Sequence, residues 1–457
     1  MSNTFRRAVA ISAAAAIAAL GLAGCSSSGT STPTDGKVTI TVAEDVGLQP
    51  AAKKDIENRV AKFEKKYPNI TVKPQEYKWT ATTFSAQLAG GTLPNVFTVA
   101  FTDGKGLIQQ HQVADISKEV AEYPWAKKLN SSVVKNGEDS KGAMLAVPIA
   151  AYGQALHYNR DLFTKAGLDP DKPPTTWAQI RKDAKQISEK TGQAGYATMT
   201  KDNTGGWTLT TMAYALGGRA ESGVGAKTKA TVNSQAFVDA LDRLHDMRWK
   251  DDSMGSNFLY DWNGINQAFV AGQVGMYVSG GGNYSSLVAQ NNIDPKMYGE
   301  SVVPLQGEDA GALGGGTLAM VSTKSTAAQQ EASVKWIDYF YMENQFDQKT
   351  ATSTAKAQAD DKQAVGVPQV PVFDKATYDK YMGWIEPYVN VPVDQFKYYT
   401  DKEFEQPLLA EPAENTQDLY GALDPVVQAV LTDQNADIPT LLAAANAKVQ
   451  SLLDAAQ

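Results

Sequence analysis

The pattern of apolar and polar positions predicts alternating strands and helices. Residues 37–42 are mostly β-branched, as is typical of a strand. Residues 51–66 place apolar side chains on one face of a helix, which the Tyr67-Pro68-Asn69 turn ends before a second strand begins at residues 70–72. Such strand–helix–strand alternation predicts a parallel or mixed sheet covered by helices.

The alternation continues along the chain. A second α/β unit is expected from the helical segment 84–89 and the strand 95–99. No internal repeat or long linker is present, so any crossovers between lobes are expected to be short. The further predicted helices are 175–191, 234–249, 326–343 and 438–455.

The N-terminal segment has the pattern of an export signal. Arg6 and Arg7 precede an apolar stretch, residues 8–23, that is short for a permanent membrane span. The stretch ends in Leu22-Ala23-Gly24-Cys25, which resembles the lipobox of bacterial lipoproteins. The resemblance implies a signal peptide over residues 1–24 and a lipidated Cys25. A Ser-rich flexible tether is expected to complete the segment 25–36.

Composition and charge narrow the function classes. The chain has 457 residues, 43% hydrophobic and 20% charged, which suits a large globular protein rather than a disordered one. Its formal charge is −8, and removal of Arg6 and Arg7 with the signal would make it −10. An acidic chain lacks the basic surface that nucleic-acid binding requires. The single cysteine excludes an internal disulfide, and with three histidines it argues against a zinc site.

Several blocks along the chain form one further pattern. They are Ala146-Val147-Pro148, residues 155–163, Lys165-Ala166-Gly167-Leu168, residues 173–177, residues 269–277, Gly280-Gly281-Gly282-Asn283-Tyr284, Val303-Pro304-Leu305, Gly314-Gly315-Gly316, residues 319–321 and residues 332–339. In this order, the blocks resemble the extracellular solute-binding proteins of ABC sugar importers, the family that includes maltose-binding protein. They span nearly the whole mature chain. They indicate the family and say little about the ligand.

The resemblance implies an α/β fold of two lobes, the type II periplasmic-binding-protein fold, with three crossings between the lobes and the ligand in the cleft. The crossings are expected near Pro148–Tyr152, near Val302–Leu305 and within 355–370. The expected boundaries are 37–148 plus 305–365 for lobe 1 and 149–304 plus 366–457 for lobe 2. Closure would occur by hinge rotation.

A sugar site needs aromatic platforms and fixed polar groups. Trp207 follows a Gly-rich loop, and Tyr284 with Asn283 follows three glycines, where the family presents residues to the sugar. Tyr152 lies at the first expected crossing. The other candidates are the acidic residues Glu44 and Asp103, which follow strands, and the aromatic residues Trp79, Trp384 and Tyr420.

The sequence therefore predicts a substrate-binding lipoprotein that delivers an oligosaccharide to the permease subunits of an ABC importer. We expect a monomer without enzymatic activity, metal or cofactor, held by its lipid anchor outside the bacterial cytoplasmic membrane. Three alternatives remain open. They are a secreted glycoside hydrolase with a carboxylate pair, a binding protein for a non-sugar polar solute such as a glycerol phosphate, and a structural surface lipoprotein.

Overall fold

The computed structural model describes residues 36–44, 46, 50–77, 79–223, 227–402, 404–412 and 414–455. The predicted signal peptide (1–24), Cys25 and all of the predicted tether but Gly36 lie outside these residues. In the described part of the chain, no helix combines the length and the apolar character that crossing a membrane requires.

Ten strands are present among the described residues. They are β1 (Val38–Glu44), β2 (Ile70–Glu76), β3 (Val96–Ala100), β4 (Ala146–Asn159), β5 (Glu221–Ser222), β6 (Lys229–Ala230), β7 (Met276–Gly280), β8 (Tyr298–Val302), β9 (Ala312–Val321) and β10 (Leu408–Ala410). Eight of them form one mixed sheet in the order β2-β1-β3-β9-β4-β7, with β10 paired to β9 and β8 paired to β4. The pairings β1–β2 and β1–β3 are parallel, whereas β3–β9, β4–β9, β4–β7 and β4–β8 are antiparallel.

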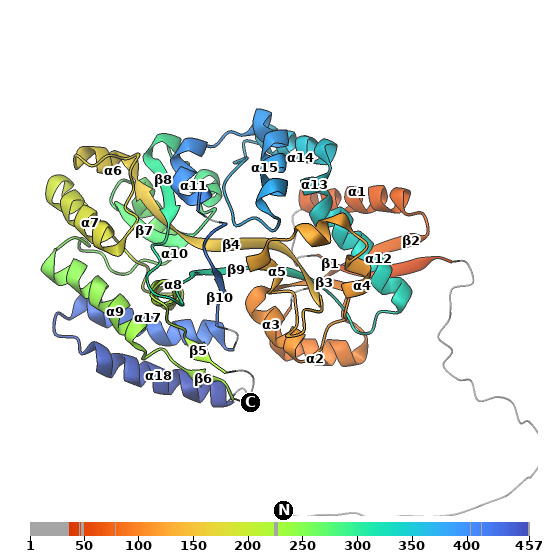
Figure 1. The fold of residues 1–457 in the computed structure, drawn as a ribbon, viewed down its shortest axis with the longest axis horizontal. Helices are drawn as coiled ribbons and strands as arrows, with labels where there is room; N and C mark the ends of the chain where they lie inside the picture. The colour runs from red at the N-terminus through yellow and green to blue at the C-terminus, as the bar shows by residue number, and fades with distance from the viewer. Residues whose placement is uncertain are drawn as a thin grey trace, which may run out of the picture. The chain divides into compact units, whose positions relative to one another are not determined.

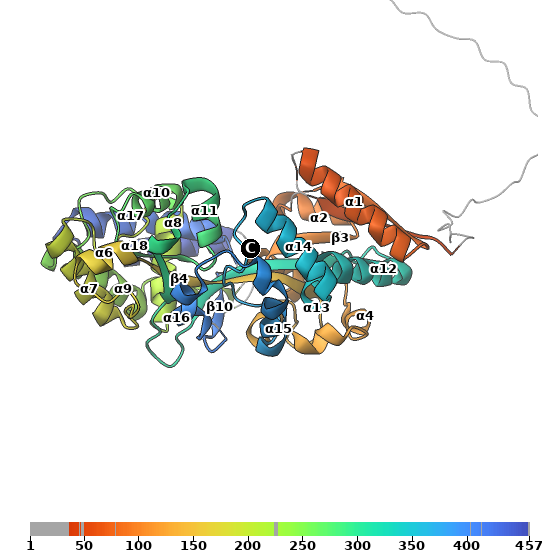
Figure 2. The ribbon, with the colours of Figure 1, turned by 90° about the horizontal axis from the view of Figure 1, so that it is seen from above.

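The helices pack around this sheet. They are α1 (Pro50–Lys66), α2 (Ala81–Gly90), α3 (Phe101–Gln109), α4 (Ser117–Val120), α5 (Ser131–Val134), α6 (Arg160–Lys165), α7 (Trp177–Thr191), α8 (Thr204–Ala215), α9 (Gln235–His245), α10 (Trp262–Val270), α11 (Tyr284–Asn291), α12 (Ala327–Ile337), α13 (Glu343–Phe346), α14 (Gln348–Asp360), α15 (Lys375–Ile385), α16 (Lys397–Thr400), α17 (Thr416–Thr432) and α18 (Ile438–Ala455). Figure 2 shows α1 and α15 on opposite sides of the long strand β4.

The predicted strands and long helices are confirmed within a few residues. The helix expected over 175–191 is α7, and Thr176 caps it by accepting a hydrogen bond from the Gln179 N–H. The helix expected over 234–249 is α9 followed by a π turn at Asp246–Lys250, and 326–343 is α12 followed by a similar turn at Asp338–Met342. Local periodicity was sufficient here because each helix buries one apolar face.

Strand β4 joins the two lobes. It pairs with β9 from Ala146 to Gly153 and with β7 and β8 from Gln154 onward. Figure 1 shows β4 as one long arrow that reaches from one lobe into the other. Strand β4 therefore carries the chain from one lobe into the other.

The chain also passes between the lobes near β9 and in the segment around residues 364–373. Residues 303–311 stay with lobe 2, because Gln306 and Gly311 donate backbone hydrogen bonds to the carbonyls of Ala215 and Tyr214. Strand β9 then carries the chain into lobe 1. Val367 packs against the lobe 2 cluster, whereas Phe373 packs in the core of lobe 1 and Asn130 donates hydrogen bonds to the backbone of Pro371 and Val372.

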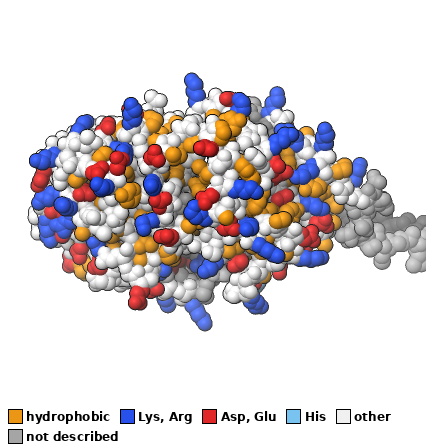
Figure 3. Space-filling model, turned by 45° about the horizontal axis from the view of Figure 1, so that its top comes forward, with side chains coloured by type: hydrophobic (Ala, Val, Ile, Leu, Met, Phe, Trp, Pro, Cys, Tyr) orange, Lys and Arg blue, Asp and Glu red, His pale blue; other side chains and the backbone are white. Residues whose placement is uncertain are grey.

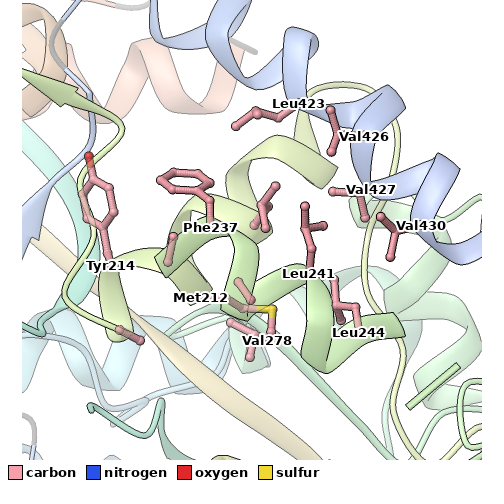
Figure 4. Close-up of a cluster of buried hydrophobic side chains, with 14 of the residues drawn as sticks. Met212, Tyr214, Phe237, Leu241, Leu244, Val278, Leu423, Val426, Val427 and Val430 are labelled. Atoms are coloured by element: carbon pink, nitrogen blue, oxygen red, sulfur yellow. The ribbon is translucent and has the colours of Figure 1, made fainter. Parts of the chain in front are cut away.

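Each lobe has its own core. In lobe 2, helices α8, α9 and α17 pack around a large apolar cluster (Figure 4). In this cluster Phe237 and Leu241 of α9 lie near apolar side chains of α17 such as Val427. In lobe 1, Phe63 of α1 packs edge-on against Trp336 of α12 at 5.2 Å between ring centroids. Two separate cores joined by a few strands allow the lobes to move as rigid bodies.

Charges are distributed without a dominant sign over the face drawn in Figure 3, where basic and acidic side chains alternate. That face offers no basic stripe of the kind that a nucleic-acid backbone would require.

Candidate functional site in the interlobe cleft

A cavity of about 800 Å³ lies between the lobes, and both lobes contribute to its walls. Its volume is in the range of a site for a drug-sized or oligosaccharide ligand. The lining residues from lobe 1 are Trp79, Phe84, Ser85, Ala100, Thr102, Asp103, Gly106, Leu107, Gln110 and Gln112. The remaining lining residues are Tyr152, Asp202, Asn203, Thr204, Trp207, Glu411, Glu414, Asn415, Thr416, Gln417, Asp418 and Tyr420.

The lobe 1 wall is built at the ends of strands. Trp79 follows β2, and Asp103 lies in the first turn of α3, directly after β3. Burial raises the pKa of the Asp103 carboxyl. The carboxyl ends of strands in an open α/β sheet are a common place for ligand sites.

The lobe 2 wall is formed where the start of α8 meets α17. Trp207 lies in the first turn of α8, so the Gly205-Gly206 pair belongs to the helix and not to the loop that its composition suggested. A Cβ on Gly206 would lie 2.2 Å from the carbonyl oxygen of Tyr420, so only glycine lets the two helices come this close. Asp424 of α17 fixes the loop before α8 by accepting bonds from the backbone N–H groups of Asn203 and Gly206, both at 2.8 Å.

A partly buried carboxyl forms the centre of the site. Glu411, just after β10, accepts a hydrogen bond from the Tyr420 hydroxyl at 3.0 Å and a long one from the Tyr152 hydroxyl at 3.5 Å. The Trp207 side chain also faces this carboxyl. Burial is the main cause that raises the pKa of Glu411, and the charge of Asp103 across the cleft raises it further.

The cleft is acidic. Five of the described lining residues are Asp or Glu, and no Lys, Arg or His is among the described lining residues. A smaller neighbouring cavity of about 190 Å³ includes Lys105 and Arg219 and shares Glu411 and Glu414 with the cleft. No group of three His, Cys, Asp or Glu that could hold a metal ion occurs among the described residues.

Five of the candidate residues from the sequence line this cavity. They are Trp79, Asp103, Tyr152, Trp207 and Tyr420. Their local signals were a position after a strand, a position at the crossing strand, or an aromatic near a Gly-rich segment.

The other four candidates lie elsewhere. Tyr284 is 1% exposed and packs against Tyr298 in the lobe 2 core, at 4.9 Å between ring centroids. Asn283 is also buried, and its amide donates to Asn266 and to the Tyr277 hydroxyl, both at 2.9 Å. Gly280 of the turn before these residues lies behind the rings of Tyr152 and Trp207, whereas the side chains of Asn283 and Tyr284 point into the core.

Trp384 and Glu44 are also outside the cavity lining. Trp384 of α15 packs against the small cluster around Ala351 and lies under the Lys380 ammonium, 5.0 Å from the ring centroid. Glu44 ends β1, in register with Glu76 of β2. Neither residue is among those that surround the cleft.

Sequence reasoning missed several lining residues. Glu411 and the residues 414–418 around the start of α17 were not selected, because the region 355–420 has no pattern that marks a site, and Phe84 was assigned only to a predicted helix. Three lining residues that were not selected, Asp202, Asn203 and Asn415, have φ values of 56°, 67° and 47° in the structure, which are unusual for residues other than glycine.

The comparison with known protein families identifies the chain. Residues 42–345 match the family described as bacterial extracellular solute-binding protein. The chain belongs to this family. Its α/β architecture with a cleft between two lobes is the periplasmic-binding-protein fold that was expected.

Curated relatives and solved structures agree with this assignment. The maltodextrin-binding protein MdxE of Bacillus subtilis is 26% identical over 71% of this chain and 74% of its own length. The sn-glycerol-3-phosphate-binding protein UgpB of Agrobacterium fabrum is 29% identical, but the match spans only 38% of this chain and 40% of that relative.

The solved structures show the likeness of fold. The sugar-binding protein MalE of Xanthomonas citri has a TM-score of 0.69 at 18% identity and covers 92% of this chain and 98% of its own. The cyclic alpha-maltosyl-1,6-maltose binding protein of Arthrobacter globiformis has a TM-score of 0.66 at 20% identity, with coverage of 92% and 100%.

Proposed function

We propose that this chain is the substrate-binding lipoprotein of an ABC importer and that it captures an oligosaccharide in the cleft. The observation that carries the proposal is the cavity of about 800 Å³ whose walls place Trp79 of lobe 1 and Trp207 of lobe 2 around uncompensated carboxylates. A sugar presents flat C–H faces to aromatic rings and hydroxyl groups to polar acceptors. The cleft supplies both kinds of partner.

Each lining residue has a distinct role in this proposal. Trp79 and Trp207 are platforms for sugar rings. Asp103 accepts bonds from ligand hydroxyls on the lobe 1 side. On the other side Glu411 does the same, while Tyr420 and Tyr152 hold its carboxyl in place.

Closure of the lobes follows from the position of these groups. A ligand that contacts Asp103 and Trp207 at once gains its full set of contacts only in the closed form, so it shifts the population toward closure. The crossing strands β4 and β9 would absorb the hinge motion. Delivery to a permease then uses the closed form as the signal that a ligand is bound.

The charge of the cleft favours an uncharged solute over a phosphate ester. Relatives named for sn-glycerol-3-phosphate exist, but a phosphate requires cationic or clustered N–H donors. The described lining residues supply five carboxylates and no cation. A phosphorylated ligand would be repelled, whereas a neutral oligosaccharide would not.

The remaining parts of the proposal concern the N-terminus and the partners. Cys25 would carry the lipid that holds the protein on the outer face of the cytoplasmic membrane, at the end of the Ser-rich tether. The permease subunits of the importer are the expected protein partners. We propose that the receptor acts as a monomer and that it does not alter its ligand.

The test is a binding screen with the purified mature chain. Maltotriose, other neutral oligosaccharides and glycerol 3-phosphate are compared by thermal shift and then by calorimetry, because a bound ligand raises the unfolding temperature in proportion to ln(1 + [L]/Kd). We expect saturable one-to-one binding of a neutral oligosaccharide, with no new reducing ends after prolonged incubation. Release of reducing ends would instead indicate a glycoside hydrolase, and binding of glycerol 3-phosphate alone would indicate a phosphate-ester receptor.

A further inference from the structure

A small polar pocket lies where the strands cross between the lobes, apart from the ligand cleft. Strand β4 changes partners at this place: Gly153 is its last residue paired with β9, and Gln154 is its first residue paired with β7. The polar residues that line the pocket are Asn130 and Ser132 of lobe 1, Gln154 of β4, and Tyr399 and Gln406 of lobe 2. Both lobes and a crossing strand therefore contribute to its wall.

The side chain of Gln154 has unmet hydrogen-bonding capacity inside this pocket. Gln154 is 0% exposed, and neither its Oε1 nor its Nε2 has a hydrogen-bond partner among the described residues. The neighbouring amide of Asn130 differs, because it donates to the Pro371 carbonyl and accepts from the Ser132 N–H, both at 3.0 Å. A buried amide without partners carries the full cost of its desolvation. Gln154 therefore requires a partner that is small enough to enter the pocket.

Gly153 leaves room for such a partner. A Cβ on Gly153 would lie 3.3 Å from Cγ2 of Val370 and 3.5 Å from Cδ1 of Leu408. It would lie 3.9 Å from Cβ of Ala312. All three of these neighbours line the pocket, so the position of the missing side chain belongs to the space that Gln154 lines. The volume of the pocket is about 10 Å³, which is close to the space that one water molecule needs.

We propose that this pocket is a hydration site at the crossing of the strands, in which the amide of Gln154 holds an internal water molecule. Water fits because it both donates and accepts, so it can pair with either end of the amide and still reach a polar group on the opposite wall. The Ser132 hydroxyl and the Gln406 amide are such groups, one from each lobe. No charged side chain is among the described residues of the pocket, which argues against an ion.

The position of the water gives it a role in the joint between the lobes. The carbonyl of Gly153 accepts a 2.7 Å hydrogen bond from the N–H of Gly281. A Cβ on the adjacent Gly280 would lie 3.8 Å from the ring of Tyr152 and 3.9 Å from the ring of Trp207. The strand beside the pocket is thus tied to the turn behind two aromatic residues of the cleft.

A contact through water suits a joint that moves. The water can take new partners when the strands rotate, whereas a direct bond between side chains holds one geometry. The part that the water plays in lobe closure rests on the proposed function. Its presence in the pocket does not, so the experiments use the ligand-free protein.

The first experiment locates and counts the water. A crystal structure of the mature chain at a resolution that shows ordered water is expected to place one molecule within hydrogen-bond distance of the Gln154 amide. Oxygen-17 magnetic relaxation dispersion of the solvent then counts the long-lived internal waters in solution. Gly153→Ala places a methyl group in the pocket, and its backbone has no left-handed φ that would oppose alanine. This variant is expected to hold one long-lived water fewer than wild type.

The second experiment is a double-mutant cycle on stability. In the wild-type background Gly153→Ala expels the water and leaves Gln154 without a partner, so the unfolding temperature is expected to fall by roughly 1–3 °C. Gln154→Met keeps the length of the side chain and removes its amide. In the Gln154→Met background Gly153→Ala is expected to raise the unfolding temperature, because the added methyl group then only gains apolar contacts and restricts the unfolded chain. Crowding against Val370 would instead lower the unfolding temperature in both backgrounds.

Gln186→Met is the matched control for the loss of an amide. Gln186 donates to the Ala166 carbonyl at 2.9 Å and does not line the pocket. Gln186→Met should therefore keep the wild-type number of long-lived waters, and Gly153→Ala should have its wild-type effect in this background.

Three results would overturn the proposal. They are a crystal structure in which the Gln154 amide contacts no water, a Gly153→Ala variant with the wild-type number of long-lived waters, and a Gly153→Ala substitution that shifts the unfolding temperature in the same direction with and without the Gln154 amide.

Discussion

The Tyr420 hydroxyl donates a 3.0 Å hydrogen bond to the carboxyl of Glu411, which was not selected from the sequence. The bond joins the first turns of α17 to the segment just after β10, at the centre of the interlobe cleft. Within the described cleft lining, the partners of Glu411 are hydroxyl groups, and no Lys, Arg or His is present to form an ion pair with it. Its carboxyl therefore remains available to a neutral, hydroxyl-rich ligand.

The first prediction concerns Glu411 itself. Burial raises the pKa of this carboxyl in the folded protein. A raised pKa means that stability is lost as the pH rises from the ordinary carboxyl range through the raised value. Glu411→Gln should therefore increase the free energy of unfolding at pH 7 and weaken sugar binding by about 1.5–3 kcal/mol, the range for hydrogen bonds to a charged group. Thermal unfolding and calorimetry measure the two effects, and a variant that lost stability together with affinity would contradict this account.

The second prediction separates cleft tryptophans from others. Trp207→Ala and Trp79→Ala should each weaken oligosaccharide binding by about 1–3 kcal/mol, because each removes a stacking platform. Trp384→Ala is the matched control, since Trp384 of α15 packs against the cluster around Ala351 and does not line the cleft. The affinity of this variant for the oligosaccharide should be unchanged. Calorimetry on folded variants measures all three, and equal losses in all three would show that the effect is not specific to the cleft.

The third prediction concerns the contact between α8 and α17. A methyl group at Gly206 would collide with the backbone of Tyr420, so Gly206→Ala should move α17, displace Tyr420 from Glu411 and lower affinity by tenfold or more. Gly383→Ala provides the comparison, because nothing lies within 4 Å of its Cβ position on α15. That change should raise stability by up to about 1 kcal/mol and leave binding unaffected. Binding titrations and chemical denaturation of both variants decide the point, and full affinity in Gly206→Ala would argue against the close contact.

The fourth prediction uses the pH dependence of stability. Because the pKa of Glu300 is raised from 4.5 to about 8, its burial should lower the free energy of unfolding progressively from about pH 4.5 to pH 8, by at most about 1.4 kcal/mol per pH unit. His157 acts in the opposite direction: its pKa is lowered to about 4, so it should reduce stability as the pH falls from about 6.5 to 4. Glu300→Gln should flatten only the alkaline side. Denaturant titrations at several pH values measure the free energy of unfolding on both the acid and the alkaline side. A free energy of unfolding that rises between pH 6 and pH 8 in the wild type would contradict the prediction.

Much of the secondary structure was accessible from the sequence, because it depends on neighbouring residues. The helix expected over 175–191 depends on local features, and the structure has it as α7, which ends at Thr191 as expected. The candidates Trp207 and Asp103 were also accessible, since each lies beside a strand end or a Gly-rich segment that a local pattern reveals.

Other parts of the site were not accessible for a definite reason. Tyr284 and Asn283 follow a glycine turn that lies close to the Tyr152 and Trp207 rings, yet the start of α11 directs their side chains into the lobe 2 core. A sequence pattern locates the turn but not the direction of the side chains that follow it. Glu411 carries no pattern at all, because its importance comes from Tyr152, Trp207 and Tyr420, which are distant in sequence.

The sequence by itself determined the alternation of strands and helices, the family resemblance, the acidic charge and the expected place of Cys25, because each depends on residue type and short-range order. Only the tertiary structure decided where the chain crosses between the lobes, which aromatic residues surround the cleft and which carboxyl groups are shielded from solvent. Those features arise when β4, β9 and β10 bring distant segments together. The pKa of Glu411 and the closeness of Gly206 to Tyr420 are consequences of that packing, and no local pattern in the chain encodes them.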